Sequence, residues 1–253
     1  MSVDISFEEL YRLVDKNDVG LKWHKEKLGI FNNFRSKITS HYKEKYSSVN
    51  WFFGRKITLF STLGVDEKTV YAVEKGISDL IKEMGFKFQI IRYNKGPADA
   101  LQMQIEHYAK ISCSADGRLN TDALSKNLGN VHASLAKESF YSGIVVITPY
   151  GSQTTPGRSE FETGTMIFGK YDYANPDLMR LLAMHEAFHL FGLNYSDHRQ
   201  IRTLWLEKFR FDYNGDCLAN HSASSNVLCL PCRLALRFFW EGVRESAKFD
   251  IWR

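Results

Sequence analysis

Two histidines one helical turn apart restrict the structures open to this 253-residue chain. His185 and His189 stand four positions apart, so in a helix their imidazoles lie on the same side and can both reach one metal ion. A helix is expected there because Asn175 can cap its start and Gly192 can end it. Glu186 lies beside the histidines, where it can take a proton from a metal-bound water and deliver it to a leaving amine. The pattern predicts a catalytic zinc site.

A third protein ligand is needed if the fourth position on the metal is to stay open for water. His189-Leu-Phe-Gly192 resembles the start of the metzincin pattern, in which the glycine turns the chain so that the third residue after it returns to the metal. That residue is Tyr195, and a phenol binds zinc weakly unless it is ionised. We therefore expect His198 to be the third ligand, on a loop three residues longer than usual. The alternatives are Asp197, Tyr195 and Glu207.

Three of the four cysteines crowd together near the carboxyl end, at Cys217, Cys229 and Cys232. A Cys-x-x-Cys pair presents two thiolates to one tetrahedral ion, and a cysteine and a histidine upstream would complete a structural Cys3His site. We expect a structural zinc here with His221 as the fourth ligand, because a structural site leaves no position open. His198 is the competing fourth ligand.

Charge and composition exclude several classes of protein. Lys and Arg number 33 against 29 Asp and Glu, and 44% of the residues are hydrophobic, so the chain has the composition of a globular protein with no marked nucleic-acid signature. No apolar run is long enough for a membrane span. The first residues lack the basic and apolar regions of a secretory signal, so we expect a cytoplasmic protein. The sequence does not specify an oligomeric state.

Hydrophobic patterns predict a layered domain over residues 56–253, preceded by a helical extension over residues 1–55. Strand, helix and strand in succession after residue 56 indicate an α/β or α+β fold. The expected strands are 56–63, 86–93, 142–148 and 165–169, with a loop at 149–157. The expected helices follow Asp66, lie between 97 and 140 with breaks at 116–117 and 129–130, and include the apolar segment 233–240.

His185-Glu186-x-x-His189-x-x-Gly192, followed by Cys229-x-x-Cys232, resembles the archaemetzincin family of zinc-dependent metallopeptidases. The resemblance covers about residues 176–232. It implies a metzincin-like mixed sheet, an active-site helix and a carboxyl-terminal subdomain stabilised by a second zinc, bound at residues 217–232. It also implies hydrolysis of a peptide or protein substrate, with Glu186 as the general base. The strand at 143–148 is then expected at the edge of the substrate cleft.

The chain departs from the family pattern at three positions. Tyr195 replaces the third histidine, Ser196 replaces a cysteine, and Ala219 replaces the methionine that forms an apolar floor beneath the metal. Leu218 or Ala219 would have to form that floor here. Two alternative functions follow. One is a SprT-like or minigluzincin-like protease, whose third ligand comes from a later helix. The other is a catalytically inactive zinc-stabilised protein whose basic amino-terminal helices bind a partner.

Overall fold

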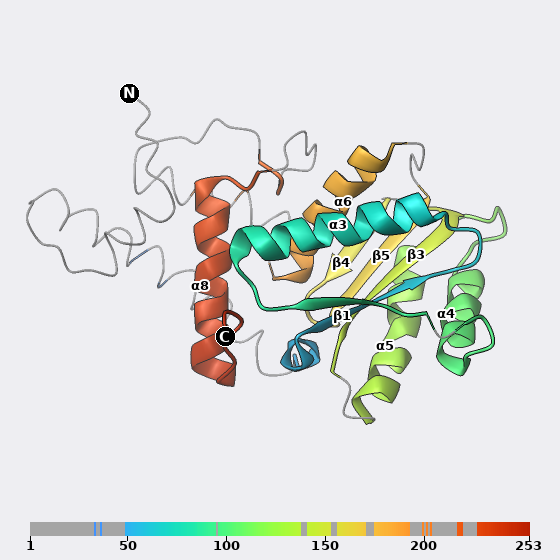
Figure 1. Cartoon of the computed structure of the whole chain (residues 1–253), viewed down its shortest axis with the longest axis horizontal. Helices are drawn as coiled ribbons and strands as arrows, with labels where there is room; N and C mark the ends of the chain where they lie inside the picture. Colours follow the sequence, from blue (N-terminus) through green and yellow to red (C-terminus); the bar gives the residue numbers. More distant parts are fainter. Residues whose placement is uncertain are drawn as a thin grey trace, which may run out of the picture.

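The computed structural model describes residues 33, 36, 49–94, 96–137, 141–152, 156–170, 175–192, 199, 201, 203, 217–219 and 227–253. Within these ranges the chain forms a mixed sheet with helices on both faces (Figure 1). The elements are η2 (Trp51–Gly54), β1 (Lys56–Ser61), α3 (Glu67–Met84), β2 (Gln89–Arg92), α4 (Ala100–Ile111), α5 (Thr121–Lys137), β3 (Gly143–Gly151), β4 (Gly157–Glu160), β5 (Thr165–Lys170), α6 (Pro176–Leu190) and α8 (Leu230–Ala247). The α/β fold class expected from the sequence is confirmed.

The sheet has five strands in the order β2-β1-β3-β5-β4. β1 pairs in parallel with β2 and β3, and β3 pairs in parallel with β5. β4 pairs antiparallel with β5 and forms one edge of the sheet. The expectation that the strand at 143–148 lies at an edge where it could bind substrate is therefore wrong. This strand is β3, which lies in the middle of the sheet, whereas β4 lies at the edge.

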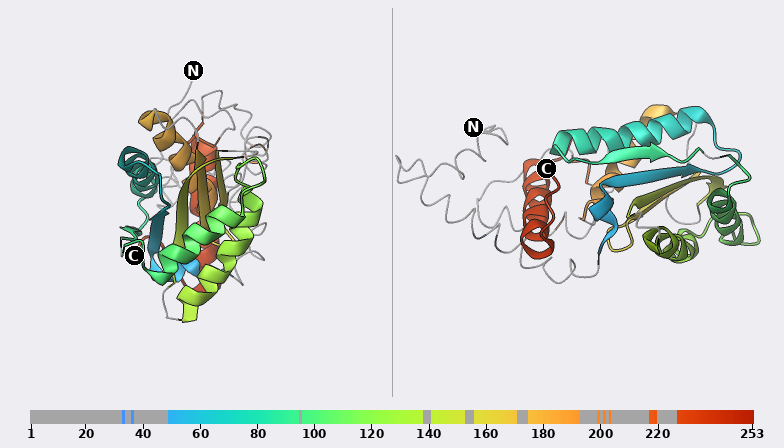
Figure 2. Two further views of the ribbon diagram at one scale, coloured as in Figure 1. Left: turned by 90° about the vertical axis from the view of Figure 1, so that its right-hand side faces the viewer. Right: turned by 60° about the horizontal axis from the view of Figure 1, so that its bottom comes forward.

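Alternating side chains of the central strands supply two hydrophobic clusters, one on each face of the sheet. Val145 and Ile147 of β3 belong to the cluster that includes α3, α6 and α8. Ile144 and Val146 belong to the cluster that includes α4 and α5. The two views of Figure 2 show α3 and α6 on one face and α4 and α5 on the other. Because both faces are covered, the central strands β1, β3 and β5 are mostly buried, whereas β2 at the edge is partly exposed.

Helix α3 begins and ends as the sequence predicts. The Asp66 carboxylate caps its start by accepting a hydrogen bond from Thr69 N at 2.9 Å. Gly85 ends it in the left-handed conformation with φ of 68°. Gly76 in its middle allows close packing on α6, because a Cβ at this position would lie 2.2 Å from the Arg180 carbonyl oxygen. Arg180 in turn pairs with Asp79 of α3 at 2.5 Å.

Two local expectations are wrong, and one strand was missed. Helix α5 runs through Gly129 and Asn130, where a break was expected. β3 continues past Pro149 to Gly151, and its register with β5 shifts between Ile147 and Gly151, which is where a strand tolerates proline. β4 was not predicted at all.

The helical extension expected over residues 1–55 lies almost entirely outside the described residues. No described helix is both long enough and apolar enough to cross a bilayer.

Candidate functional site

Helix α6 carries the three residues on which the predicted catalytic site depends. Asn175 Oδ1 accepts a hydrogen bond from Leu178 N at 3.2 Å, and Pro176 occupies the first turn, so the helix begins where the sequence predicts. Met179, Ala183, Met184, Ala187 and Phe188 are buried, which fixes the rotation of the helix about its axis. His185 and His189 are half-buried on the remaining side.

The two imidazoles face each other through their Nε2 atoms, 3.0 Å apart. Their ring centroids are 4.6 Å apart and their planes meet at 87°. Two nitrogens bound to one tetrahedral zinc at about 2.0–2.1 Å lie about 3.4 Å apart, so small ring rotations would suffice for both to bind one ion. The donor atoms therefore fit the metal site expected from the spacing.

The other ring nitrogen of His185 is held by the backbone. His185 Nδ1 lies 2.6 Å from the carbonyl oxygen of Leu218, which can only accept a hydrogen bond, so Nδ1 donates. In the neutral ring this leaves the lone pair on Nε2, the atom directed at His189. The arrangement is typical of metal-binding histidines, whose second nitrogen donates to a carboxylate or carbonyl that fixes the ring.

Glu186 is 6% exposed and packs against the edge strand β4. A Cβ on Gly157 would lie 2.7 Å from Glu186 Cγ and 2.8 Å from Oε1, so only glycine leaves room for the carboxylate in this position. Burial raises the pKa of Glu186 to about 7, while the Ser159 hydroxyl and the charge of Arg158 act to lower it. A carboxylate titrating near neutrality suits a group that must both accept and donate a proton.

Successive side chains of β4 point to opposite faces of the sheet. The strand therefore contacts α6 on one face and α5 on the other. Gly157 and Ser159 lie on the side of Glu186. Arg158 and Glu160 form an ion pair at 2.6 Å. Arg158 also pairs with Asp122 of α5, and Ser125 of α5 donates to Glu160 at 3.0 Å, so this short edge strand is firmly held.

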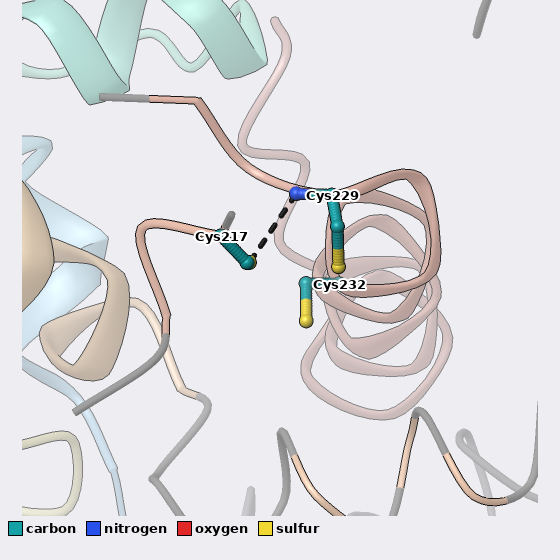
Figure 3. Close-up of side chains that lie close together, drawn as sticks. All are labelled: Cys217, Cys229 and Cys232. Carbon is teal, nitrogen blue, oxygen red and sulfur yellow. Dashed lines mark hydrogen bonds between the residues drawn. The ribbon is translucent and has the colours of Figure 1, made fainter. Parts of the chain in front are cut away.

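The three carboxyl-terminal cysteines come together in the second predicted site (Figure 3). The sulfurs of Cys217, Cys229 and Cys232 all lie within 4.8 Å of one another, and these residues are the one group of three or more His, Cys, Asp or Glu in the described ranges that could hold a metal ion. Thiolates around a tetrahedral zinc, with Zn–S of about 2.3 Å, lie about 3.8 Å apart. The cluster is therefore close to the geometry of a zinc site with three of its ligands supplied.

The environment of the cluster keeps the thiols protonated unless a cation is bound. The three side chains are at most 3% exposed. The hydrogen bond with the Cys217 side chain, together with burial, raises the pKa of Cys229 to about 12, and burial raises the pKa of Cys232 well above its usual value. Buried thiols of this kind ionise only when a cation replaces their protons. Cys229 caps α8, so the positive end of that helix also favours thiolates here.

Several predicted ligands lie outside the described residues. These are His198, Asp197, Tyr195 and Glu207, the candidates for the third ligand at the histidines, and His221, the candidate fourth ligand at the cysteines. Their assignments remain predictions. Gly192, which was expected to end the helix and turn the chain, follows α6 with φ of 119°.

Sequence reasoning missed the residues that reach the site from other parts of the chain. The Leu218 carbonyl holds His185 across 33 positions, and Gly157 and Ser159 lie against Glu186 from β4, with the charge of Arg158 nearby. A backbone carbonyl carries no side-chain signal. Gly157 was interpreted as a loop glycine, and its close approach to Glu186 depends on tertiary packing.

Comparisons with known proteins give a remote similarity to solved structures. No family model matches the sequence, and no curated protein matches it. The crystal structure of archaemetzincin from Methanopyrus kandleri matches with a TM-score of 0.45 and 15% identity, over 74% of this chain and 95% of that chain. The relation is a distant structural one. It does not show that this chain belongs to the archaemetzincin family.

Proposed function

We propose that the chain is a zinc-dependent metallopeptidase. The observation that carries the proposal is the pair of histidine Nε2 atoms, 3.0 Å apart on α6, with the buried carboxylate of Glu186 on the adjacent helix position. His185 and His189 would hold the ion together with a third ligand, for which His198 is our candidate. A divalent ion bound there would supply Lewis-acid activation of water and of the scissile carbonyl.

The chain's own residues supply the proton transfer and the orientation. Glu186 would accept a proton from the attacking water at a carboxylate oxygen and pass it to the leaving amine nitrogen. Gly157 leaves the space in which this carboxylate lies, and Ser159 and Arg158 stabilise its ionised form. Leu218 keeps the His185 lone pair on Nε2 through the hydrogen bond at Nδ1.

A peptide substrate would bind in extended form along β4. This strand is the edge of the sheet beyond β5, and it packs against α6 next to Glu186. An edge strand can pair with an extended chain through its unused backbone groups, which gives affinity with little dependence on side chains. The cysteine cluster would hold a second, structural zinc.

The test is Glu186→Gln, compared with the wild type for zinc content and for hydrolysis of a diverse peptide library analysed by mass spectrometry. The variant should bind the same amount of zinc and lose hydrolysis by a factor of about 10²–10⁴, because the amide cannot take the proton. Glu162→Gln is the matched control, since Glu162 is exposed in the turn before β5 and lies outside the site.

Two results would contradict the proposal. Hydrolysis retained by Glu186→Gln would exclude Glu186 as the base. A zinc-loaded wild type that cleaves nothing in the library would instead favour the catalytically inactive, zinc-stabilised protein.

A further inference from the structure

The segment Cys217-Leu218-Ala219 belongs to both candidate metal sites. Cys217 contributes a sulfur to the cysteine cluster, and the next residue, Leu218, accepts the hydrogen bond from His185 Nδ1 at 2.6 Å. All three residues are buried. The two sites are thus joined by the short backbone path from Cys217 to the Leu218 carbonyl and by one hydrogen bond.

The same segment is attached to the amino-terminal end of α8. Leu218 N donates to the Val227 carbonyl oxygen at 2.9 Å, and Cys229 N donates to Cys217 Sγ at 3.3 Å. Figure 3 shows Cys217 approaching from its own loop while Cys229 and Cys232 project from the start of α8. The position of Leu218 therefore depends on how Cys217 is held against this helix.

Metal binding at the cluster has to move or fix Cys217. A zinc bound to the three sulfurs would set them about 3.8 Å apart, a spacing inside the 4.8 Å within which they lie here. The planar peptide unit after Cys217 ends at the Leu218 Cα, which carries the Leu218 carbonyl, so a displacement of Cys217 that reaches this Cα changes the position or direction of the carbonyl. A change of a few tenths of an ångström alters a hydrogen bond of 2.6 Å.

We propose that metal binding at Cys217, Cys229 and Cys232 sets the metal affinity of the His185–His189 pair, with the Leu218 carbonyl as the positioning group. The cluster then controls the histidine site as well as stabilising the fold. This inference rests on the proposed function, since it requires that the histidines bind a metal. Loss of a partner that orients a histidine ligand typically weakens metal binding 10–100-fold. Coupling between two binding sites is reciprocal, so an ion on the histidines should strengthen binding at the cysteines by the same factor.

The first test uses the double variant Cys229→Ser/Cys232→Ser in the full chain, titrated with cobalt(II) and compared with the wild type. Sulfur-to-cobalt charge-transfer absorption reports the cysteine site alone, whereas the visible d–d bands report both sites, and the part of them that is lost in His185→Ala reports the histidine site. We expect the charge-transfer band to disappear and the histidine site to bind cobalt(II) at least 10-fold more weakly.

Cys113→Ser is the matched control for exchanging a thiol for a hydroxyl. Cys113 donates to the Ala109 carbonyl oxygen and packs with the cluster on the opposite face of the sheet. The Cys113→Ser variant should leave the cobalt(II) affinities of the cysteine site and of the histidine site unchanged. An unchanged histidine-site affinity in the double variant would overturn the inference while leaving the proposed function intact. The His185→Ala variant distinguishes failure of the inference from failure of the proposed function. If this variant binds as many cobalt(II) ions as the wild type, the proposed function itself fails.

A second measurement does not depend on the variants folding normally. In the ¹⁵N-labelled wild type with the histidine site kept empty, nitrogen chemical shifts of His185 report which ring nitrogen is protonated. With zinc on the cysteines, Nδ1 should carry the proton, as the Leu218 contact requires. Removing that zinc should shift the His185 signals towards a mixture of tautomers. Identical spectra with and without the zinc would overturn the inference.

Discussion

Gly157 and Glu186 fit against each other so closely that one methyl group should disturb the chemistry. An alanine Cβ at 157 would lie 2.7 Å from Glu186 Cγ and 2.8 Å from Oε1. These atoms are the far end of a flexible side chain, so the carboxylate can move aside with little cost to the fold. We expect Gly157→Ala to lower hydrolysis about 100-fold, the effect of a displacement near 1 Å in a catalytic group. Zinc content and melting temperature should change little.

Gly129→Ala is the control for this prediction. Gly129 lies in α5 on the other face of the sheet, and a Cβ there meets no atom within 4 Å. Alanine is favoured over glycine inside a helix by about 1 kcal/mol, so this variant should be slightly more stable and fully active. If Gly157→Ala retained full hydrolysis, the position of Glu186 against β4 would be irrelevant to the reaction.

At the scale of single residues, the sequence predicted which side chains belong together on one element. The spacing of His185 and His189 fixes their common side because a helix has 3.6 residues per turn. The sequence could not predict the Leu218 carbonyl or the space at Gly157. Both depend on where distant segments pack, and neither involves a side chain that a pattern could reveal.

The end of α6 is fixed by its contact with α8. Gly192 has φ of 119°, and a Cβ there would lie 2.4 Å from two carbons of the Phe239 ring, which is fully buried in α8. Gly192→Ala therefore combines backbone strain with a clash against a ring that cannot move freely. We expect a loss of about 3 kcal/mol or more in the free energy of unfolding, measured by urea denaturation.

Gly85→Ala separates the two contributions. Gly85 ends α3 with φ of 68°, but a Cβ there meets nothing within 4 Å. Gly85→Ala should therefore lower the free energy of unfolding by the conformational strain alone, about 1–2 kcal/mol. Equal losses in the two variants would mean that the contact between Gly192 and Phe239 contributes nothing to stability.

At the scale of elements, strongly patterned segments were predicted well and weakly patterned ones were not. α3 and α6 have capping residues and helical apolar spacing, so their limits follow from local chemistry. β4 has the sequence Gly-Arg-Ser-Glu, which lacks β-branched and aromatic residues, and it is a strand because β5 pairs with it. A single glycine in α5 costs about 1 kcal/mol, too little to break a helix packed on the sheet.

For the whole molecule, the cysteine cluster joins the segment 217–219 to a core shared by α3, α6 and α8. Cys217, Cys229 and Cys232 belong to the same hydrophobic cluster as the buried faces of these helices. Arg233, one residue after Cys232, donates to Glu83 of α3 at 2.8 Å. A metal that closes the cluster therefore stabilises contacts between elements far apart in the sequence.

Chelation should for this reason lower the stability of the whole fold. An ion that binds the folded chain and is present at about 1,000 times its Kd stabilises it by about 4 kcal/mol. For a protein of this size that corresponds to a fall of roughly 8–16 °C in Tm when the ion is removed. Calorimetry of the zinc-loaded protein before and after treatment with a strong chelator measures this shift. Cys232→Ser should melt near the chelated wild type and respond little to the chelator, whereas His189→Ala should keep a reduced response, because its cysteine cluster is intact but lacks the ion on the histidines that strengthens binding there. A full chelator response in Cys232→Ser would place the stabilising ion at the histidines instead.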